Sequence, residues 1–240
     1  MRVCVLMVGA ARPSAERVVE NIRKNVAFFT ANYPDYTFDF VVCTYKNESF
    51  TVISEFCEAN GVTVYPLEPI NDFDIPKELD GLVFPSSPDF TSKNRYRLFY
   101  SMSHVLSKIS EQKTPYDCIV RLRIDTEIRA FELVDTIQPS TYYTVIDTPV
   151  SCSDNIGYAS LGVMKKVWEL DNCFVKANNA EILVFKAIEK NSFRISQIKF
   201  RYVMYQGDSE YFDGVKQWSR RNREWAYDGK TYVRGERVGT

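Results

Sequence analysis

The sequence predicts an α/β fold, with one domain built on a mainly parallel central sheet flanked by helices. Two observations carry this prediction. Strand-like apolar runs alternate with helical patterns from the N-terminus to Leu67, which is the order that builds a doubly wound sheet. The 240 residues are 45% hydrophobic and 25% charged, a composition that can bury one sizeable core. No internal repeat or low-complexity linker divides the chain.

The elements of the first half follow from apolar periodicity and from capping residues. Val3–Val8 is a continuous apolar run that ends at Gly9, which is typical of a strand buried on both faces. Ser14 is a good N-cap for the helix that follows. In chain order the predictions continue with a strand at Phe38–Thr44, a helix at Thr51–Asn60 closed by Gly61, and a strand at Val62–Leu67.

The second half opens with Glu68–Asp89, a segment rich in Pro, Asp and Ser that we expect to be a functional, mobile loop. The further predicted elements are a helix at Ser92–Ser110, strands at Tyr116–Ile128 and Tyr142–Ile146, helices at Val163–Leu170 and Ala180–Lys190, and a strand at Ile195–Tyr205. We divide the chain into one domain at residues 1–217 and a basic, aromatic C-terminal extension at residues 218–240.

Composition and missing motifs exclude several classes of function. The formal net charge of -1 provides no whole-chain attraction to nucleic acid. No apolar run approaches the roughly 20 residues of a membrane span, and the six cysteines form no C-x-x-C pair. We therefore expect a reduced, cytoplasmic protein with no transmembrane segment and no nucleic-acid partner. The glycine patterns of P-loop enzymes and dinucleotide dehydrogenases are absent.

The strand predicted at Tyr116–Ile128 carries charge on one face. A period of two places four charged side chains on the same side, namely Arg121, Arg123, Asp125 and Glu127. One interpretation is a solvated ladder on an edge strand. The other is a cleft at the carboxyl end of the strand, where Asp125 and Glu127 hold one divalent cation. In this second interpretation Arg123 orients Asp125 or touches a pyrophosphate, and the deeper Arg121 is structural and paired with an acid elsewhere.

The same strand resembles a segment of GT-A glycosyltransferases. Asp125-Thr-Glu127 is similar to their D-x-D motif. Tyr116 to Asp125 is similar to the Y-D-x-x-x-R-x-R-x-D pattern of transferases that build lipopolysaccharide and capsule-like glycans. Three other segments fit the resemblance, which covers most of the chain: Gly9-Ala-Ala-Arg12, Ser153–Tyr158 followed by Val163-Met164, and Asn179–Leu183. The chain departs from the family pattern at Glu127 and at the Asn-Ala pair before Glu181.

The resemblance implies a GT-A-like, Rossmann-like sheet and a nucleotide-sugar-dependent hexosyl- or pentosyltransferase. It implies a UDP- or GDP-sugar donor and a glycan or glycoprotein acceptor. The residues implied at the nucleotide sugar are Gly9, Arg12, Arg123 and Asp125. A divalent metal cofactor, Mn²⁺ or Mg²⁺, is implied on Asp125 and Glu127. For Arg12 the alternative is an ordinary surface residue before Pro13.

Two carboxylates are candidates for catalysis. Asp154 is a candidate for the base that deprotonates the acceptor hydroxyl, and its alternative is a turn-forming Asp-Asn pair. Glu181 matches a helix-start acid of the family, and its alternative is a charge that complements the helix dipole.

Two other functions remain open. One is a sugar-phosphate nucleotidyltransferase, although the Gly9–Pro13 segment lacks its richer glycine loop and its Pro-Lys signature. The other is a catalytically inactive domain that binds a nucleotide sugar or glycan.

Overall fold

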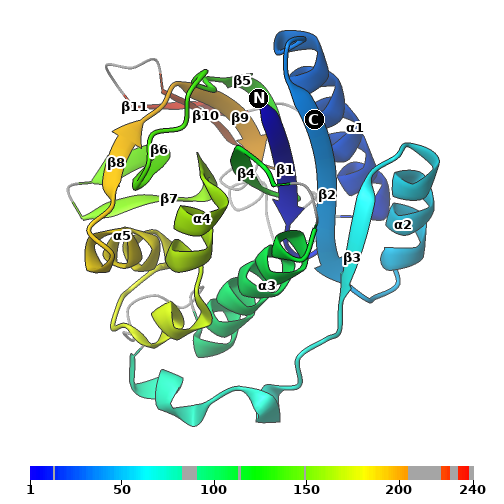
Figure 1. Ribbon diagram of the computed structural model, residues 1–240. Coiled ribbons are helices and arrows are strands. Elements are labelled where there is room, and N and C mark those ends of the chain that lie inside the picture. The colour runs from blue at the N-terminus through cyan, green and yellow to red at the C-terminus, as the bar shows by residue number, and fades with distance from the viewer. Residues whose placement is uncertain are drawn as a thin grey trace.

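The computed structural model describes residues 1–12, 14–82, 91–112, 115–148, 150–204, 223–227 and 232–237 (Figure 1). The strands are β1 (Arg2–Val8), β2 (Thr37–Tyr45), β3 (Thr63–Leu67), β4 (Cys118–Arg123), β5 (Thr126–Phe131), β6 (Thr141–Thr148), β7 (Ser151–Ala159), β8 (Arg194–Gln197), β9 (Phe200–Met204), β10 (Arg223–Tyr227) and β11 (Tyr232–Arg237). The α-helices are α1 (Ala15–Asn32), α2 (Phe50–Ala59), α3 (Ser92–Ser110), α4 (Leu161–Val167) and α5 (Ala180–Lys190). Short 3₁₀ turns lie at Asp72–Asp74, Lys77–Leu82 and Leu170–Phe174.

The central sheet has seven strands in the order β3-β2-β1-β4-β7-β6-β8. The first four strands in this order run parallel, and β6 runs parallel to β8. Strand β7 is antiparallel to both of its neighbours, β4 and β6. The prediction of a mainly parallel sheet flanked by helices is therefore confirmed.

Alternation along β1 divides the core into two layers. Val3, Val5 and Met7 pack toward α1 and α2, whereas the intervening side chains of β1 pack toward α3, α4 and α5. Because both faces are covered, the strand is apolar throughout, as its sequence predicts. Helix α1 begins where expected, since the Ser14 hydroxyl accepts a hydrogen bond of 3.3 Å from the Arg17 amide.

The prediction of one strand at Tyr116–Ile128 is wrong. Strand β4 ends at Arg123, the chain turns at Ile124-Asp125, and β5 belongs to a second sheet with the order β11-β10-β9-β5. Helix α1 holds the start of β5 in that sheet through Asn25. The Asn25 amide nitrogen donates to the Thr126 carbonyl at 2.8 Å, and its oxygen accepts from the Ile128 amide at 2.9 Å. A contact from a distant helix thus decides where the strand breaks.

Two other segments differ from their predictions. The expected strand at Ile195–Tyr205 is two short strands, β8 and β9, which lie in different sheets. Strand β7 was not predicted, because its Ser, Asp, Asn and Gly residues are typical of turns.

The structure describes only part of the expected C-terminal extension and of the expected loop Glu68–Asp89. The backbone of β10 pairs with β9, and β11 pairs with β10. The proposed division at residue 217 stays a prediction. Of the expected loop Glu68–Asp89, residues 83–89 lie outside the described part of the chain, and its mobility stays a prediction.

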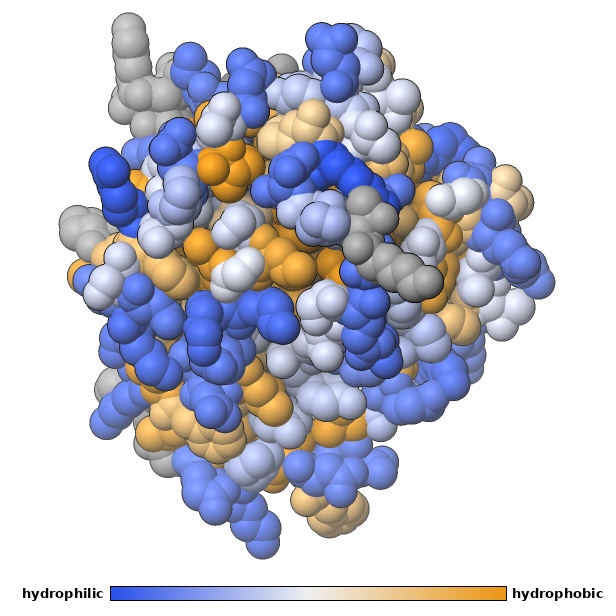
Figure 2. Space-filling view, viewed as in Figure 1, coloured by the Kyte–Doolittle hydropathy of each residue, from blue (hydrophilic) through white to orange (hydrophobic). Residues whose placement is uncertain are grey.

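On the face shown in Figure 2, hydrophilic and hydrophobic residues are interspersed and do not form one large hydrophobic patch. All six cysteines are buried, and none of them forms a disulfide within the described part of the chain. Among the described helices, none combines the length and the apolar character needed to cross a bilayer.

Candidate active site

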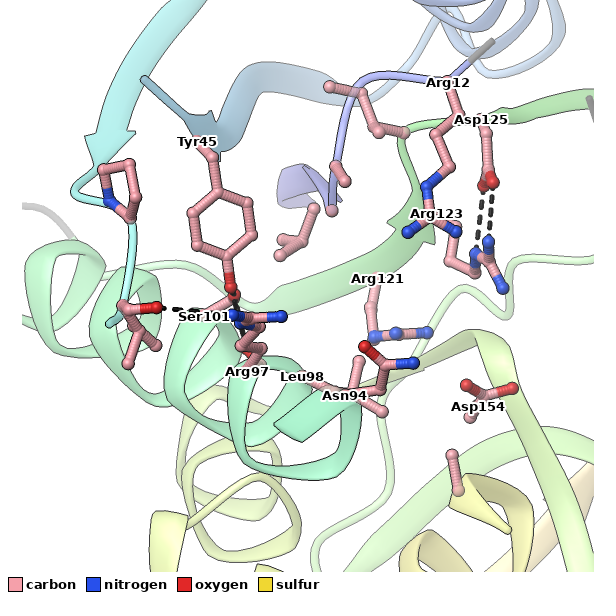
Figure 3. A pocket seen from close by; sticks show the side chains of 17 residues that line it. Arg12, Tyr45, Asn94, Arg97, Leu98, Ser101, Arg121, Arg123, Asp125 and Asp154 are labelled. Atoms are coloured by element: carbon pink, nitrogen blue, oxygen red, sulfur yellow. Dashed lines mark hydrogen bonds and ion pairs between the residues drawn. The ribbon is translucent and has the colours of Figure 1, made fainter. Parts of the chain in front are cut away.

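A cavity of about 420 Å³ opens at the carboxyl ends of β1, β2 and β4 (Figure 3). Side chains from the ends of these strands and from the face of α3 line it. The lining residues are Val8, Gly9, Ala10, Arg12, Tyr45, Pro69, Ile70, Asn94, Arg97, Leu98, Ser101, Arg121, Arg123, Ile124, Asp125, Asp154 and Ala180. Four arginines and two aspartates therefore share one cavity.

The position of the cavity follows from the strand order. From β1 the chain proceeds outward to β2 and β3, and it then returns to place β4 on the other side of β1. The chain that leaves β1 enters α1 on one face of the sheet, whereas α3, which leads into β4, covers the other face. Open α/β sheets bind ligands in the crevice formed at such a reversal, outside the carboxyl ends of the strands.

Arg123 and Asp125 form a two-pronged ion pair across the turn that follows β4. The Arg123 Nε and Nη2 atoms donate to the two carboxylate oxygens of Asp125 at 3.0 and 2.6 Å, and Nη1 donates to Asn155 Oδ1 at 3.2 Å. Burial opposes the charge on Arg123, but the neighbouring Asp125 and Asp154 carboxylates outweigh it and raise its pKa. Arg123 therefore orients Asp125, as the sequence predicts.

Arg121 lies deeper and is placed differently from its expected role. Only 1% of the residue is exposed, and its guanidinium lies over the Trp168 ring at 4.3 Å from the ring centroid. Among the described residues, none accepts a hydrogen bond from its three side-chain nitrogens. Burial lowers its pKa, while Asp154 opposes that effect. A charged fork without hydrogen bonds thus faces the cavity instead of pairing with an acid.

Asp154 lies on β7, between β4 and β6 in the sheet, rather than in a turn. The residue is 8% exposed and lines the cavity. In Figure 3 its carboxylate lies on the same side of the cavity as the two β4 arginines, below Arg123 and Asp125 in the view. The turn interpretation is therefore wrong, because Asp154-Asn155 lies within β7, at the register shift between the pairing of Cys152 and that of Gly157 with β6.

Gly157 makes room for the side chains that support Arg121. A Cβ atom at Gly157 would lie 2.7 Å from the Tyr142 hydroxyl, so only glycine fits there. The Trp168 indole nitrogen donates to that same hydroxyl at 3.4 Å, and Trp168 in turn lies under the guanidinium of Arg121. The three residues Gly157, Tyr142 and Trp168 hence form a stack beneath the cavity.

Replacing Gly157 with Ala is expected to destabilise the protein by about 1–3 kcal/mol, the usual cost of overpacking a core. The reason is that the new methyl group forces the fully buried Tyr142 to shift. Urea denaturation measures the change. Gly162→Ala in α4 is the matched control, because its added Cβ would have no neighbour within 4 Å and alanine is the better helix former. A Gly157→Ala variant as stable as the Gly162→Ala variant would contradict the stack.

Glu127 does not join Asp125 at the cavity. It is 3% exposed and pairs with Lys24 of α1 at 3.0 Å and with Arg129. The expected shared face is wrong because the turn at Ile124-Asp125 breaks the period of two. Within the described residues, no group of three or more His, Cys, Asp or Glu side chains is arranged to hold a metal ion.

The Gly9–Arg12 segment reaches the cavity as expected. Gly9 has a φ of +142°, a backbone conformation that residues other than glycine rarely adopt. Its amide donates a hydrogen bond to the Cys43 carbonyl at 3.1 Å. The exposed side chain of Arg12 extends toward Arg123 and Asp125 in Figure 3. A positive charge at the mouth thus adds to the two arginines below it.

Glu181 is in the first turn of α5, which Asn179 caps by accepting from the Ile182 amide at 2.9 Å. Its neighbour Ala180 lines the cavity, whereas Glu181 is not among the lining residues. This position favours the interpretation in which Glu181 complements the helix dipole.

Helix α3 supplies a wall that sequence reasoning missed. Its lining residues, Asn94, Arg97, Leu98 and Ser101, recur at helical spacing on one face. Arg97 also ties the helix to the preceding segment, because it donates to the Ile70 carbonyl at 3.3 Å and pairs with Asp72 at 2.9 Å. The spacing of these polar residues was the available signal.

The sequence matches no protein-family model and no curated protein. Similar solved structures include the galactosyltransferase LgtC with donor and acceptor sugar analogs (14% identity, TM-score 0.46, covering 82% of this chain and 73% of that chain). An active-site mutant of LgtC is also similar (14% identity, TM-score 0.47, covering 82% and 72%). The third is a mutant of Drosophila β-1,4-galactosyltransferase 7 with manganese, UDP-Gal and xylobiose (10% identity, TM-score 0.44, covering 82% and 65%). This level of likeness assigns no substrate, metal or residue role.

Proposed function

We propose that this protein is a glycosyltransferase that moves a sugar from a nucleoside-diphosphate sugar to a hydroxyl of a glycan or glycoprotein. One observation carries the proposal: a buried guanidinium without hydrogen-bond partners, Arg121, faces the same cavity as the buried carboxylate of Asp154. The first group suits an anion, and the second suits a hydroxyl that loses its proton. The cavity lies where open α/β sheets bind nucleotides.

The chemistry of transfer requires both groups. The bond between the anomeric carbon and the diphosphate oxygen breaks, and the diphosphate keeps the electron pair. Positive charge placed around the departing diphosphate stabilises the transition state. Arg12, Arg121 and Arg123 supply positive charge along one side of the cavity. We assign Gly9 and Arg12 to the nucleotide end, because both precede α1 at the mouth of the cavity.

We assign Asp154 as the base. The acceptor oxygen forms the new bond to the anomeric carbon, and its proton passes to the Asp154 carboxylate. Asp125 is a weaker candidate for this role, because Arg123 binds both of its carboxylate oxygens. Asp125 instead holds the Arg123 fork in place.

The divalent metal implied by the sequence resemblance does not fit the pair Asp125 and Glu127. Hard cations such as Mg²⁺ and Mn²⁺ need free carboxylate oxygens that converge on one point. Both oxygens of Asp125 accept from Arg123, and Glu127 pairs with Lys24 and Arg129 away from the cavity lining. No step of the proposed transfer is therefore assigned to a metal on this pair.

We keep the cytoplasmic location within the proposal. The six reduced cysteines support it, because disulfides rarely persist in the reducing cytosol.

Nucleotide binding is expected to raise the melting temperature of the protein. A ligand at 100 times its Kd stabilises the folded state by about 2.7 kcal/mol, which for a domain of this size corresponds to roughly 5–10 °C. The measurement is a thermal-shift panel of UDP, GDP and their sugars, with adenine nucleotides as controls. A panel without any shift would contradict the proposal.

Product analysis separates the two alternative functions. A nucleotidyltransferase releases pyrophosphate from a nucleoside triphosphate and a sugar phosphate, whereas a glycosyltransferase releases a nucleoside diphosphate. An inactive binding domain shifts in the thermal panel and releases neither product.

A further inference from the structure

The guanidinium of Arg121 is buried at the cavity and makes no hydrogen bond within the part of the chain that the structure describes. We propose that Arg121, rather than a divalent cation on Asp125 and Glu127, supplies the positive charge that binds the diphosphate of the donor. This inference rests on the proposed function and deepens it by naming the group that meets the leaving group. It makes nucleotide binding independent of added metal.

Both carboxylates that a metal would need are already paired with cationic side chains. A metal on Asp125 would have to displace a two-pronged contact with Arg123, whose shorter arm is 2.6 Å. It would then lie beside the positive charges of Arg121 and Arg123 without a second carboxylate from Glu127. Like charges in a water-poor cavity repel strongly. The local electrostatics therefore favour an anion over a cation.

Arg121 is a buried charge that lacks the hydrogen bonds such a group normally makes. Burying a charged group without hydrogen bonds is costly, so such groups are rare unless a ligand completes them. Arg121 is 1% exposed, and its Nε, Nη1 and Nη2 atoms donate no hydrogen bond to any described residue. A diphosphate in the cavity would supply the missing acceptors. Arginine suits this task because its planar fork donates two parallel hydrogen bonds to a phosphate.

Packing against Trp168 holds the guanidinium of Arg121 in place. The guanidinium lies over the indole of Trp168 at 4.3 Å from the centroid. A guanidinium placed over an aromatic face keeps its N–H edges available, because those bonds lie in its own plane. Trp168 is in turn tied to Tyr142 at 3.4 Å. The charge is thus oriented by packing before the anion arrives, which reduces the cost of binding.

The experiment is calorimetric titration of the full chain with UDP, GDP and inorganic pyrophosphate. Each titration is made once with EDTA and once with Mn²⁺. The principal variant is Arg121→Met, which keeps the length of the side chain and removes the charge. The matched control is Arg95→Met: Arg95 is also fully buried with two unpartnered nitrogens, but it does not line the cavity. Melting temperatures are recorded for all proteins.

We expect UDP or GDP to bind in EDTA with a Kd within about threefold of its value in Mn²⁺. Arg121→Met should raise that Kd about 10- to 100-fold, the range for hydrogen bonds to a charged group. Its melting temperature should be equal to or above that of the original protein, because an unpartnered buried charge is replaced by an apolar side chain. Arg95→Met should leave the Kd unchanged.

Three results would overturn the inference. Binding that appears only with Mn²⁺ would assign the diphosphate to a metal and would leave the proposed function standing. Unchanged nucleotide affinity in Arg121→Met would show that Arg121 does not bind the diphosphate, and it would also leave the proposed function standing. Absence of binding by every probe under both conditions would contradict the proposed function as well. If Arg121→Met does not fold, Arg121→Lys replaces it, with an expected rise in Kd because lysine lacks the fork.

Discussion

Replacing Asp154 with Asn is expected to lower the rate of glycosyl transfer by about 10²- to 10⁴-fold, the usual contribution of a positioned general base. An amide keeps the shape of the side chain but cannot take the proton of the acceptor hydroxyl. Since Asp154 is assigned to the acceptor and not to the diphosphate, the Kd for UDP or GDP should change little. Steady-state kinetics and calorimetry on the same preparation measure the two effects.

Glu169→Gln is the matched control for this substitution. Glu169 is an exposed carboxylate paired with Lys166 at 3.4 Å, and it does not line the cavity. Its variant should transfer sugar at the original rate. If Asp154→Asn retained full turnover, Asp154 would not be the base, and Asp125 would become the carboxylate to test next.

Replacing Asp125 with Ala is expected to reduce the free energy of unfolding by roughly 1–3 kcal/mol, because the Asp125 side chain is buried while that of Arg123 is 25% exposed. Asp125 is 2% exposed and holds both arms of the Arg123 fork. Its removal leaves a cation in a cavity that already contains Arg121. Urea denaturation measures the loss, and the variant should also lose nucleotide binding as Arg123 moves.

The double variant Asp125→Leu with Arg123→Met tests the cause of that loss. It removes both charges, so most of the stability should return even though activity does not. A loss below about 1 kcal/mol in Asp125→Ala would place the pair with exposed ion pairs. That outcome would contradict the view that Asp125 anchors Arg123.

Local sequence patterns predicted much of the fold because the elements concerned are long and strongly periodic. Helix α3 occupies Ser92–Ser110 and helix α5 occupies Ala180–Lys190, as predicted. Strand β1 was recognised from its apolar run. Strand β7 was missed because its composition is that of a turn, and it becomes a strand only through pairing with β4 and β6.

The candidate site shows the same division. Spacing alone placed Arg121 and Arg123 on one face, whereas the ion pair between Arg123 and Asp125 forms across the turn that ends β4. Spacing could not separate Asp125 from Glu127, because the break between them depends on Asn25 of a helix far away in the chain.

The sequence by itself determined the class of the fold, the helices that cover it, and the segment that bears the chemistry. These properties depend on periodicity and capping, which are interactions between residues near one another in the chain. Only the tertiary structure decided which charges are paired. In it Glu127 pairs with Lys24, Asp154 of β7 lines the cavity, and Arg121 is buried without a hydrogen bond to any described residue. Such pairing depends on contacts between distant segments, and a linear pattern does not contain them.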